Sequence, residues 1–185
     1  DCATMNSTLK FLSLPNAPLD TAHVLILPIP HEKTVTFKQG TAKGPEAILA
    51  ASDQLEFYEE DRGWCPTLHM LLAVLSPVVG IEGEAEYAFH RRLSGITADL
   101  PAAPLLIALG GEHSITPDMV FSRMPEGGTV VQIDAHADLR PSYQGSVFNH
   151  ACPMHRLREK GYRLIQIGIR SLHAGEAAVI GADAG

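Results

Sequence analysis

Two short segments of the chain carry residue types that bind divalent metal ions. Residues 110–114 read Gly-Gly-Glu-His-Ser after one apolar run, and residues 134–138 read Asp-Ala-His-Ala-Asp after a second apolar run at 130–133. Both runs have the composition of buried strands, and ligand sites in open α/β sheets lie just beyond the carboxyl ends of the strands. We therefore expect four side chains to converge on one crevice: His113, Asp134, His136 and Asp138.

These side chains form a mixed set of nitrogen and oxygen ligands. Two imidazoles with two carboxylates suit Mn²⁺ or Zn²⁺ better than Ca²⁺, because the hardest cations prefer oxygen ligands alone. Two carboxylates buried close together without a counter-charge are costly, so the cluster implies a cation or a shifted protonation state. A single Asp at a strand end is usually a turn former or a helix cap. Four such residues at two strand ends favour the metal site.

The apolar pattern around the motifs alternates between strands and helices. Strands are predicted at 24–27, where the first ends at Pro28, and at 105–109, 130–133 and 164–167. Such apolar runs separated by helices predict a parallel sheet that is covered on both faces. The expected fold class is therefore α/β. No internal repeat or linker interrupts the chain, so a single domain over residues 1–185 is expected.

Four helices are predicted between these strands. The first begins at Pro45 and presents apolar residues at helical spacing, namely Ile48, Ala51, Leu55 and Tyr58. The second begins near Glu82 and presents Ala85, Phe89, Leu93 and Ile96. The third begins at Thr116, and the fourth runs through residues 154–157 and closes at Gly161.

Composition narrows the class of protein. The chain has 185 residues, of which 45% are hydrophobic and 19% charged, as in an ordinary soluble domain. No run of about 20 apolar residues occurs, so no membrane span is expected. The net charge of −7 argues against nucleic acid as a partner. The odd, scattered set of Cys2, Cys65 and Cys152 is typical of a reducing cytosol, so we expect a cytoplasmic protein without a disulfide framework.

Both metal motifs resemble those of the ureohydrolases, the arginase and agmatinase family, which hydrolyse guanidino compounds to urea and an amine. Residues 40–48 are similar to the family's Gly-Pro helix start, residues 146–154 to its His-Ala segment, and residues 166–171 to the strand that follows. The likeness runs from about Leu25 to the C-terminus. It implies a three-layer sandwich with a central parallel sheet, as in arginase.

The resemblance also implies a site with two Mn²⁺ ions and a role for each residue. His113 and Asp138 would bind one ion, His136 would bind the other, and Asp134 would bridge both. His150 would be the active-site histidine that moves protons, and Asp138 would also hydrogen-bond the attacking water. The one departure within the first motif is Glu112, where the family more often has Asp.

A later part of the family pattern is absent from this sequence. The remaining metal ligands of the family come from a Ser-x-Asp-x-Asp-x-x-Asp-Pro segment, and nothing after Arg170 matches it. The sequence is therefore interpreted as a ureohydrolase domain that is incomplete at the C-terminus and inactive, or nearly so, by itself. The alternative from another class is a non-catalytic relative that acts as an assembly or regulatory subunit.

The expected substrate is a small cationic guanidino compound, namely agmatine, hydrolysed to putrescine and urea in polyamine biosynthesis. In arginases the loop after the second motif carries an Asn that binds the substrate's α-carboxylate, whereas this chain has Arg140. The segment at 150–154 is also more similar to agmatinases. Arginine and guanidinobutyrate stay open as alternatives, because Arg140 could pair with a carboxylate. The family likeness further implies a homo-oligomer, either a trimer or a hexamer.

Several nearby residues are interpreted as structural. Cys152 lies two residues from His150, but a small buried side chain is the better reading than a thiol nucleophile. The pair Gly110 and Gly111 is explained by close approach of the backbone to the metal pocket. Surface positions are predicted for four unclustered histidines: His69, His90, His155 and His173.

Overall fold

The computed structural model describes residues 7–183, so Cys2 lies outside the described residues. Two compact units make up the chain. The first comprises the described residues up to Glu32, Lys38–Gly80 and Leu100–Gly111, and the second comprises Lys33–Phe37, Ile81–Asp99 and the residues from Glu112 onward. All strand pairs within the named sheets are parallel, which confirms the predicted α/β class.

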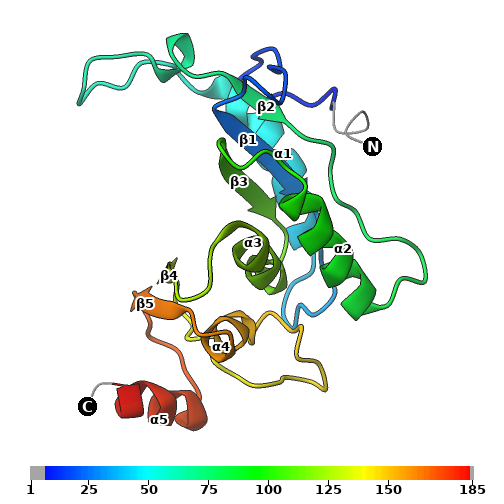
Figure 1. Ribbon diagram of the computed structural model, residues 1–185, viewed down its shortest axis with the longest axis vertical. Coiled ribbons are helices and arrows are strands. Elements are labelled where there is room, and N and C mark those ends of the chain that lie inside the picture. Colours follow the sequence, from blue (N-terminus) through cyan, green and yellow to red (C-terminus); the bar gives the residue numbers. More distant parts are fainter. Residues whose placement is uncertain (1–6, 184–185) are drawn as a thin grey trace. The chain divides into compact units, whose positions relative to one another are not determined.

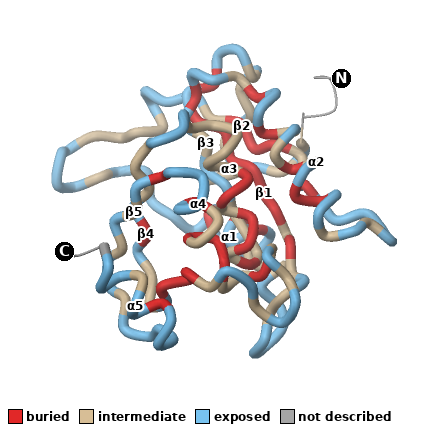
Figure 2. Tube along the Cα trace, turned by 60° about the horizontal axis from the view of Figure 1, so that its bottom comes forward, coloured by how far each residue is buried: buried red, intermediate tan, exposed pale blue. Residues whose placement is uncertain are grey.

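The first unit is built on a three-stranded sheet. Its strand order is β2 (Leu72–Val74), β1 (Val24–Ile29) and β3 (Leu105–Gly110), and helix α1 (Gly44–Ala51) packs against β1 and β3 (Figure 1). Every residue of β1 is buried, as expected for a strand with a partner on both sides (Figure 2). The buried cluster between sheet and helix comprises Val24, Ile26, Leu49 and Val74.

Strand β1 continues past Pro28, where the sequence predicted its end. Strand β2 stops at Val74, which is paired with Ile26, so Pro28 has a strand partner in Leu109 of β3 alone, and its carbonyl accepts the amide of Val78 beyond β2 at 2.9 Å. Proline has no amide hydrogen to donate, and it is tolerated in a strand where the ladder runs along one side only. The early end of β2 therefore allows β1 to reach Ile29.

Helix α1 begins at Gly44, one residue before the predicted Pro45, and ends earlier than the sequence predicted. All four residues predicted for its apolar face are exposed: Ile48 and Ala51 lie within the helix, and Leu55 and Tyr58 follow it. The hydroxyl of Ser52 donates a hydrogen bond of 2.6 Å to the carbonyl of Leu49. Such side-chain bonds to the backbone compete with continuation of a helix. After Ser52 only a single 3₁₀ turn follows, and the extended chain begins at Leu55.

The second unit contains a two-stranded parallel sheet and four helices among its described residues. The strands are β4 (Thr129–Ile133) and β5 (Arg163–Ile167). The helices are α2 (Glu86–Ala98), α3 (Thr116–Arg123), α4 (Pro153–Glu159) and α5 (Ala174–Asp183). Helix α2 begins four residues after the predicted start, whereas α3 begins at Thr116 as predicted. Gly161 follows α4 with a φ of +81°, in agreement with its predicted role as a helix terminator.

The two faces of the β4–β5 sheet differ in burial. On one face, Val130 and Leu164 pack against a buried cluster that includes Met154 and Leu157 of α4. On the other face, paired apolar side chains are between 50% and 81% exposed: Val131, Ile133, Ile165 and Ile167. Within the described residues, no helix has the length and apolar character needed to cross a lipid bilayer.

The Gly110–Gly111 pair approaches a strand backbone. The amide of Gly111 donates to the carbonyl of Ile29 at 3.0 Å, and a Cβ at Gly111 would overlap the carbonyl oxygen of His31. Gly111 therefore approaches a backbone closely, although the sequence predicted an approach to the metal pocket. Its partner is the segment that ends β1.

We expect Gly111→Ala to lower the free energy of unfolding by about 1–3 kcal/mol, because the added methyl group has no room against a backbone carbonyl. Urea denaturation followed by circular dichroism measures this change. Gly80→Ala is the matched control, since a Cβ there meets open space within the same unit. Equal losses of stability in the two variants would contradict the expectation.

Candidate metal centre

Three of the four predicted ligands lie together in the second unit. His113, Asp134 and Asp138 each offer one ligand atom, and these atoms lie within 4.8 Å of one another. Nδ1 of His113 is 2.8 Å from Oδ2 of Asp138. His136 lies outside this group and its side chain is 64% exposed, although its Nδ1 is 3.5 Å from Oδ1 of Asp134. Asp134 is thus the carboxylate close to both histidines.

Asp134 is held at the end of strand β4 by backbone contacts. Its amide donates to the carbonyl of Ile167 at 3.1 Å, which continues the parallel ladder one residue beyond the strand. Its Oδ1 accepts the amide of His136 at 2.7 Å. Burial raises the pKa of Asp134, but this amide and the nearby His113 and His136 rings together lower it by more, so the pKa lies below its ordinary value. The carboxylate is therefore presented in its charged form, as a metal ligand must be.

Asp138 has a left-handed backbone conformation, with a φ of +51°. Few residues other than Gly adopt this conformation, and Asp is among those that tolerate it best. The carbonyl of Asp138 accepts the amides of Met154 and His155, at 3.1 and 3.2 Å, in the first turn of α4. The start of α4 thus anchors the backbone at Asp138, while the buried carboxylate pairs with His113.

A pair of glutamines supports the 134–138 loop, and sequence reasoning missed both of them. Gln132 of β4 and Gln166 of β5 are paired in the sheet, and their side-chain amides hydrogen-bond to each other. Nε2 of Gln132 donates to the carbonyl of His136 at 3.2 Å, and Nε2 of Gln166 donates to the carbonyl of Ala137 at 2.7 Å. A single Gln inside each apolar strand was the signal that could have found them.

His150 lines the same cleft as the predicted metal ligands. The cleft has a volume of about 570 Å³ and is lined by Thr36, Phe37, His113, Asp134, His136, Asp138, Arg140, Tyr143, His150, Ala151, Ser171, Leu172 and Glu176. Nδ1 of His150 is 3.1 Å from the hydroxyl of Thr34, a residue that sequence reasoning did not single out. The structure therefore brings the predicted histidine to the predicted ligands.

The Thr34 hydroxyl connects Glu112 to His150. Glu112 is buried, and its carboxylate accepts hydrogen bonds from the hydroxyls of Ser114 and Thr34 and from the amides of Lys33 and Thr34. Burial raises the pKa of Glu112, but these hydrogen bonds together lower it by more, so the pKa lies below its ordinary value. Glu112, which directly precedes His113, is therefore a charged acceptor that holds the segment at 33–34.

Arg140 lies in the cleft with an acidic and an aromatic neighbour. Its guanidinium carbon is 4.4 Å from the centre of the Tyr143 ring, and its Nε is 3.9 Å from Oε2 of Glu176. Glu176 is buried and also accepts the amides of Leu139 and His173, at 2.9 and 2.6 Å. A negative charge thus offsets the positive charge of Arg140 inside the cleft.

The structure tests the interpretations given to Cys152 and to the four unclustered histidines. Cys152 is fully buried and burial raises the pKa of its thiol, which supports the structural reading. His69 and His173 are exposed as predicted, whereas His155 is half-buried. The surface prediction for His90 is wrong. His90 is buried because its Nδ1 pairs with Asp118 and its ring stacks on Phe148, with 4.6 Å between ring centres.

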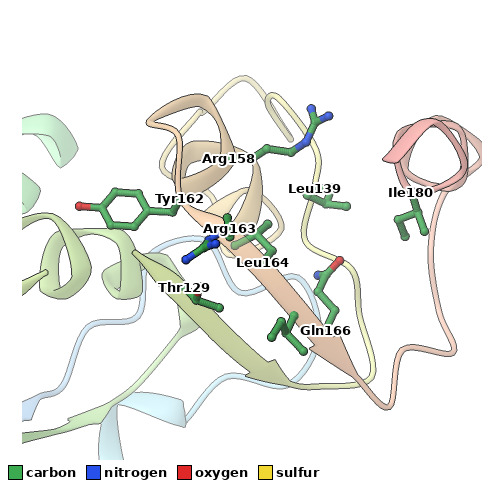
Figure 3. A pocket seen from close by; sticks show the side chains of 9 residues that line it. Thr129, Leu139, Arg158, Tyr162, Arg163, Leu164, Gln166 and Ile180 are labelled. Carbon is green, nitrogen blue, oxygen red and sulfur yellow. The ribbon is translucent and has the colours of Figure 1, made fainter. Parts of the chain in front are cut away.

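A larger cavity of this unit, of about 690 Å³, lies between β5, α4 and α5 (Figure 3). The residues that line it are Thr129, Leu139, Arg158, Tyr162, Arg163, Leu164, Ile165, Gln166 and Ile180. None of these lining residues is a histidine, cysteine or carboxylate, so this cavity offers no metal ligands. The smaller cleft is therefore the candidate site.

Known proteins of one family are similar to this chain over most of its length. Residues 22–185 match the family model described as "Arginase family". The chain belongs to the arginase family. The N(1)-aminopropylagmatine ureohydrolase of Thermus thermophilus is 38% identical over 159 residues, which cover 85% of this chain and 54% of that protein. The agmatinase of Pyrococcus horikoshii is 36% identical over 163 residues, covering 86% and 56%.

Solved structures of the arginase family show the same fold. The agmatine ureohydrolase of Thermoplasma volcanium superimposes with a TM-score of 0.76 at 29% identity, and the match covers 91% of this chain and 57% of that one. The resemblance to ureohydrolases and the arginase-like α/β fold are thereby confirmed. The chain spans just over half the length of the relatives that it matches.

Proposed function

We propose that this chain carries part of the active site of a manganese-dependent ureohydrolase that hydrolyses agmatine to putrescine and urea. The observation that carries the proposal is the convergence of His113, Asp134 and Asp138 in a cleft that His150 also lines. One imidazole nitrogen with two carboxylates is a donor set that suits Mn²⁺, since this ion accepts nitrogen and oxygen ligands alike.

The proposed ligands divide between two ions. His113, Asp134 and Asp138 would hold the first, and Asp134 and His136 would contribute to the second. When bound, such ions lower the pKa of water and stabilise the charge that develops during hydrolysis. The exposed side chain of His136 is free of the tight cluster, as a ligand directed to a different ion should be.

The remaining residues of the cleft would orient water and move protons. Asp138 would accept a hydrogen bond from the attacking water as well as bind metal. His150 is the proposed proton carrier to the departing amine, because histidine titrates nearest to physiological pH. Arg140, which is close to Tyr143 and Glu176, lines the cleft where the far end of a guanidino substrate could lie.

Substrate choice can be tested with guanidino compounds that differ at this far end. Agmatine is expected to exceed arginine by at least about tenfold in kcat/KM, or roughly 1.4 kcal/mol, because Arg140 stands where arginases have a carboxylate-binding Asn. Urea release by the gene product that contains this chain is the measurement. N(1)-aminopropylagmatine belongs in the same assay, because relatives at 36–38% identity are named for it.

The other outcomes of this assay have defined meanings. Equal efficiencies with agmatine and arginine would reject the agmatinase assignment and leave the family membership intact. A preference for guanidinobutyrate would mean that the charge of Arg140 dominates over that of Glu176. No urea from any guanidino compound would favour the non-catalytic alternative.

A further inference from the structure

Thr34 makes hydrogen bonds to two charged or titratable residues of the second unit at once. Its hydroxyl oxygen lies 3.0 Å from Oε1 of Glu112 and 3.1 Å from Nδ1 of His150. The same oxygen also accepts the backbone amide of His150 at 3.0 Å. Thr34 is half-buried, and 116 residues of sequence separate it from His150. Three hydrogen bonds therefore meet at one hydroxyl group.

A hydroxyl group has one hydrogen to donate and two lone pairs that accept. The backbone amide of His150 can only donate, so it occupies one lone pair. The Glu112 carboxylate, which also accepts two backbone amides and the Ser114 hydroxyl, has no hydrogen to donate in its ionised form, so the hydrogen of this contact comes from Thr34. What is left at Thr34 is one lone pair, and it faces Nδ1 of His150.

We infer that Thr34, held by Glu112, is a positioning residue that keeps the neutral His150 ring in the tautomer with its hydrogen on Nδ1. The opposite arrangement would set an unprotonated Nδ1 against the hydroxyl oxygen, with no hydrogen between them. Nε2 is then the nitrogen of His150 that accepts and releases a proton. A hydrogen bond to one ring nitrogen determines the chemistry of the other in this way.

The tautomer does not depend on the proposed function. The inference rests on that function only for the role of Nε2 in carrying a proton. If His150 serves the departing amine, the exchange takes place at Nε2 while Nδ1 stays bound to Thr34. Glu112 also fixes the position of Thr34 through the backbone. Its Oε2 accepts the amide of Lys33 at 3.0 Å and the amide of Thr34 at 2.8 Å. Both the direction of the hydroxyl and the location of its oxygen are therefore determined.

Nitrogen NMR of the histidine rings tests the tautomer directly. The 185-residue protein is labelled with ¹⁵N-histidine, and the spectrum is recorded at mildly alkaline pH so that the neutral ring is observed. His150→Gln assigns the signals by their loss. We expect a protonated Nδ1 and an unprotonated Nε2 in the wild type and in Thr34→Ser, which keeps the hydroxyl. In Thr34→Val the preference for Nδ1 should disappear.

Thr21→Val is the matched control, because Thr21 is exposed and, among the described residues, its hydroxyl donates within its own turn, to Pro18. Its His150 signals should equal those of the wild type. A wild-type ring protonated on Nε2 would overturn the inference, and so would an unchanged tautomer in Thr34→Val. If Thr34→Val does not fold, the wild-type and Thr34→Ser spectra still decide, because each must show the Nδ1 hydrogen.

Kinetics of the gene product that contains this chain separate the inference from the proposed function. We expect Thr34→Val to lower kcat for urea release by at least about tenfold with KM little changed, and Thr34→Ser to restore most of the rate. The Nδ1 tautomer without any urea release would reject the proposed function and leave the inference standing. Urea release with the Nε2 tautomer would reject the inference alone.

Discussion

Asp134→Ala is expected to weaken Mn²⁺ binding by at least about 100-fold and to abolish urea release. Asp134 is the carboxylate that belongs to the cluster with His113 and Asp138 and also lies beside His136. Its removal takes a ligand from both proposed ions, whereas loss of a supporting residue outside the ligand set typically costs about 10–100-fold in affinity. No added base should restore the reaction, because what is lost is the binding of the ions.

Calorimetric titration of the 185-residue protein with Mn²⁺ measures the affinity, and urea release by the gene product that contains it measures the activity. Asp20→Ala is the control, because Asp20 is exposed and lies in the other unit. Chelation should abolish the wild-type activity, and Mn²⁺ should restore it best among divalent ions. An Asp134→Ala variant that binds Mn²⁺ as tightly as the control would refute the proposed ligand set.

The ligands could be predicted from the sequence because they lie in two local motifs at strand ends. His113, Asp134 and Asp138 are few in number and close to their strands, so knowing where the strands end is enough to place them. Residues that act across long separations could not be found this way. Thr34 reaches His150 only because the fold brings together two segments that are 116 residues apart, and nothing in residues 33–37 indicates this contact.

The fold was predictable where apolar runs are unambiguous and less so where local hydrogen bonds decide. Strands β1, β3, β4 and β5 were recognised from their continuous apolar composition, which a buried parallel sheet requires, whereas the three-residue strand β2 was not predicted. The end of α1 depends on the Ser52 hydroxyl, and the burial of His90 depends on Asp118, which lies 28 residues away. Hydrophobic periodicity predicts neither effect, because it treats every polar side chain as exposed and contains no information on its hydrogen-bond partners.

The exposed apolar face of the β4–β5 sheet shows another limit of reasoning from pattern. Val131, Ile133, Ile165 and Ile167 made these strands read as buried on both faces, yet these four side chains are at least half exposed. The apolar composition of a strand indicates the environment that suits it. The exposed fraction of its side chains measures what packs against it among the described residues. The relatives matched by this chain are almost twice as long as the aligned region.

His150→Ala is expected to act differently from Asp134→Ala, because His150 is proposed to move protons and lies outside the ligand cluster. The variant should keep the Mn²⁺ affinity of the wild type and lose about 10²–10⁴ in kcat, the usual contribution of a general acid or base. Imidazole added to the solution should recover part of this loss, since it can enter the cleft and carry the proton in place of the missing ring.

Metal content and rate must be measured on the same preparations. Loss of a ligand and loss of a proton carrier both lower the rate, but only loss of a ligand lowers the metal content. His150→Ala removes the ring whose Nδ1 donates to the Thr34 hydroxyl and leaves Glu112 in place, so the contacts of Glu112 with Ser114 and with the amides of residues 33 and 34 should hold that segment. A variant that loses Mn²⁺ as fully as Asp134→Ala would make His150 a ligand or a structural residue. In that case imidazole would restore nothing, and the proton-carrier role would have to be withdrawn.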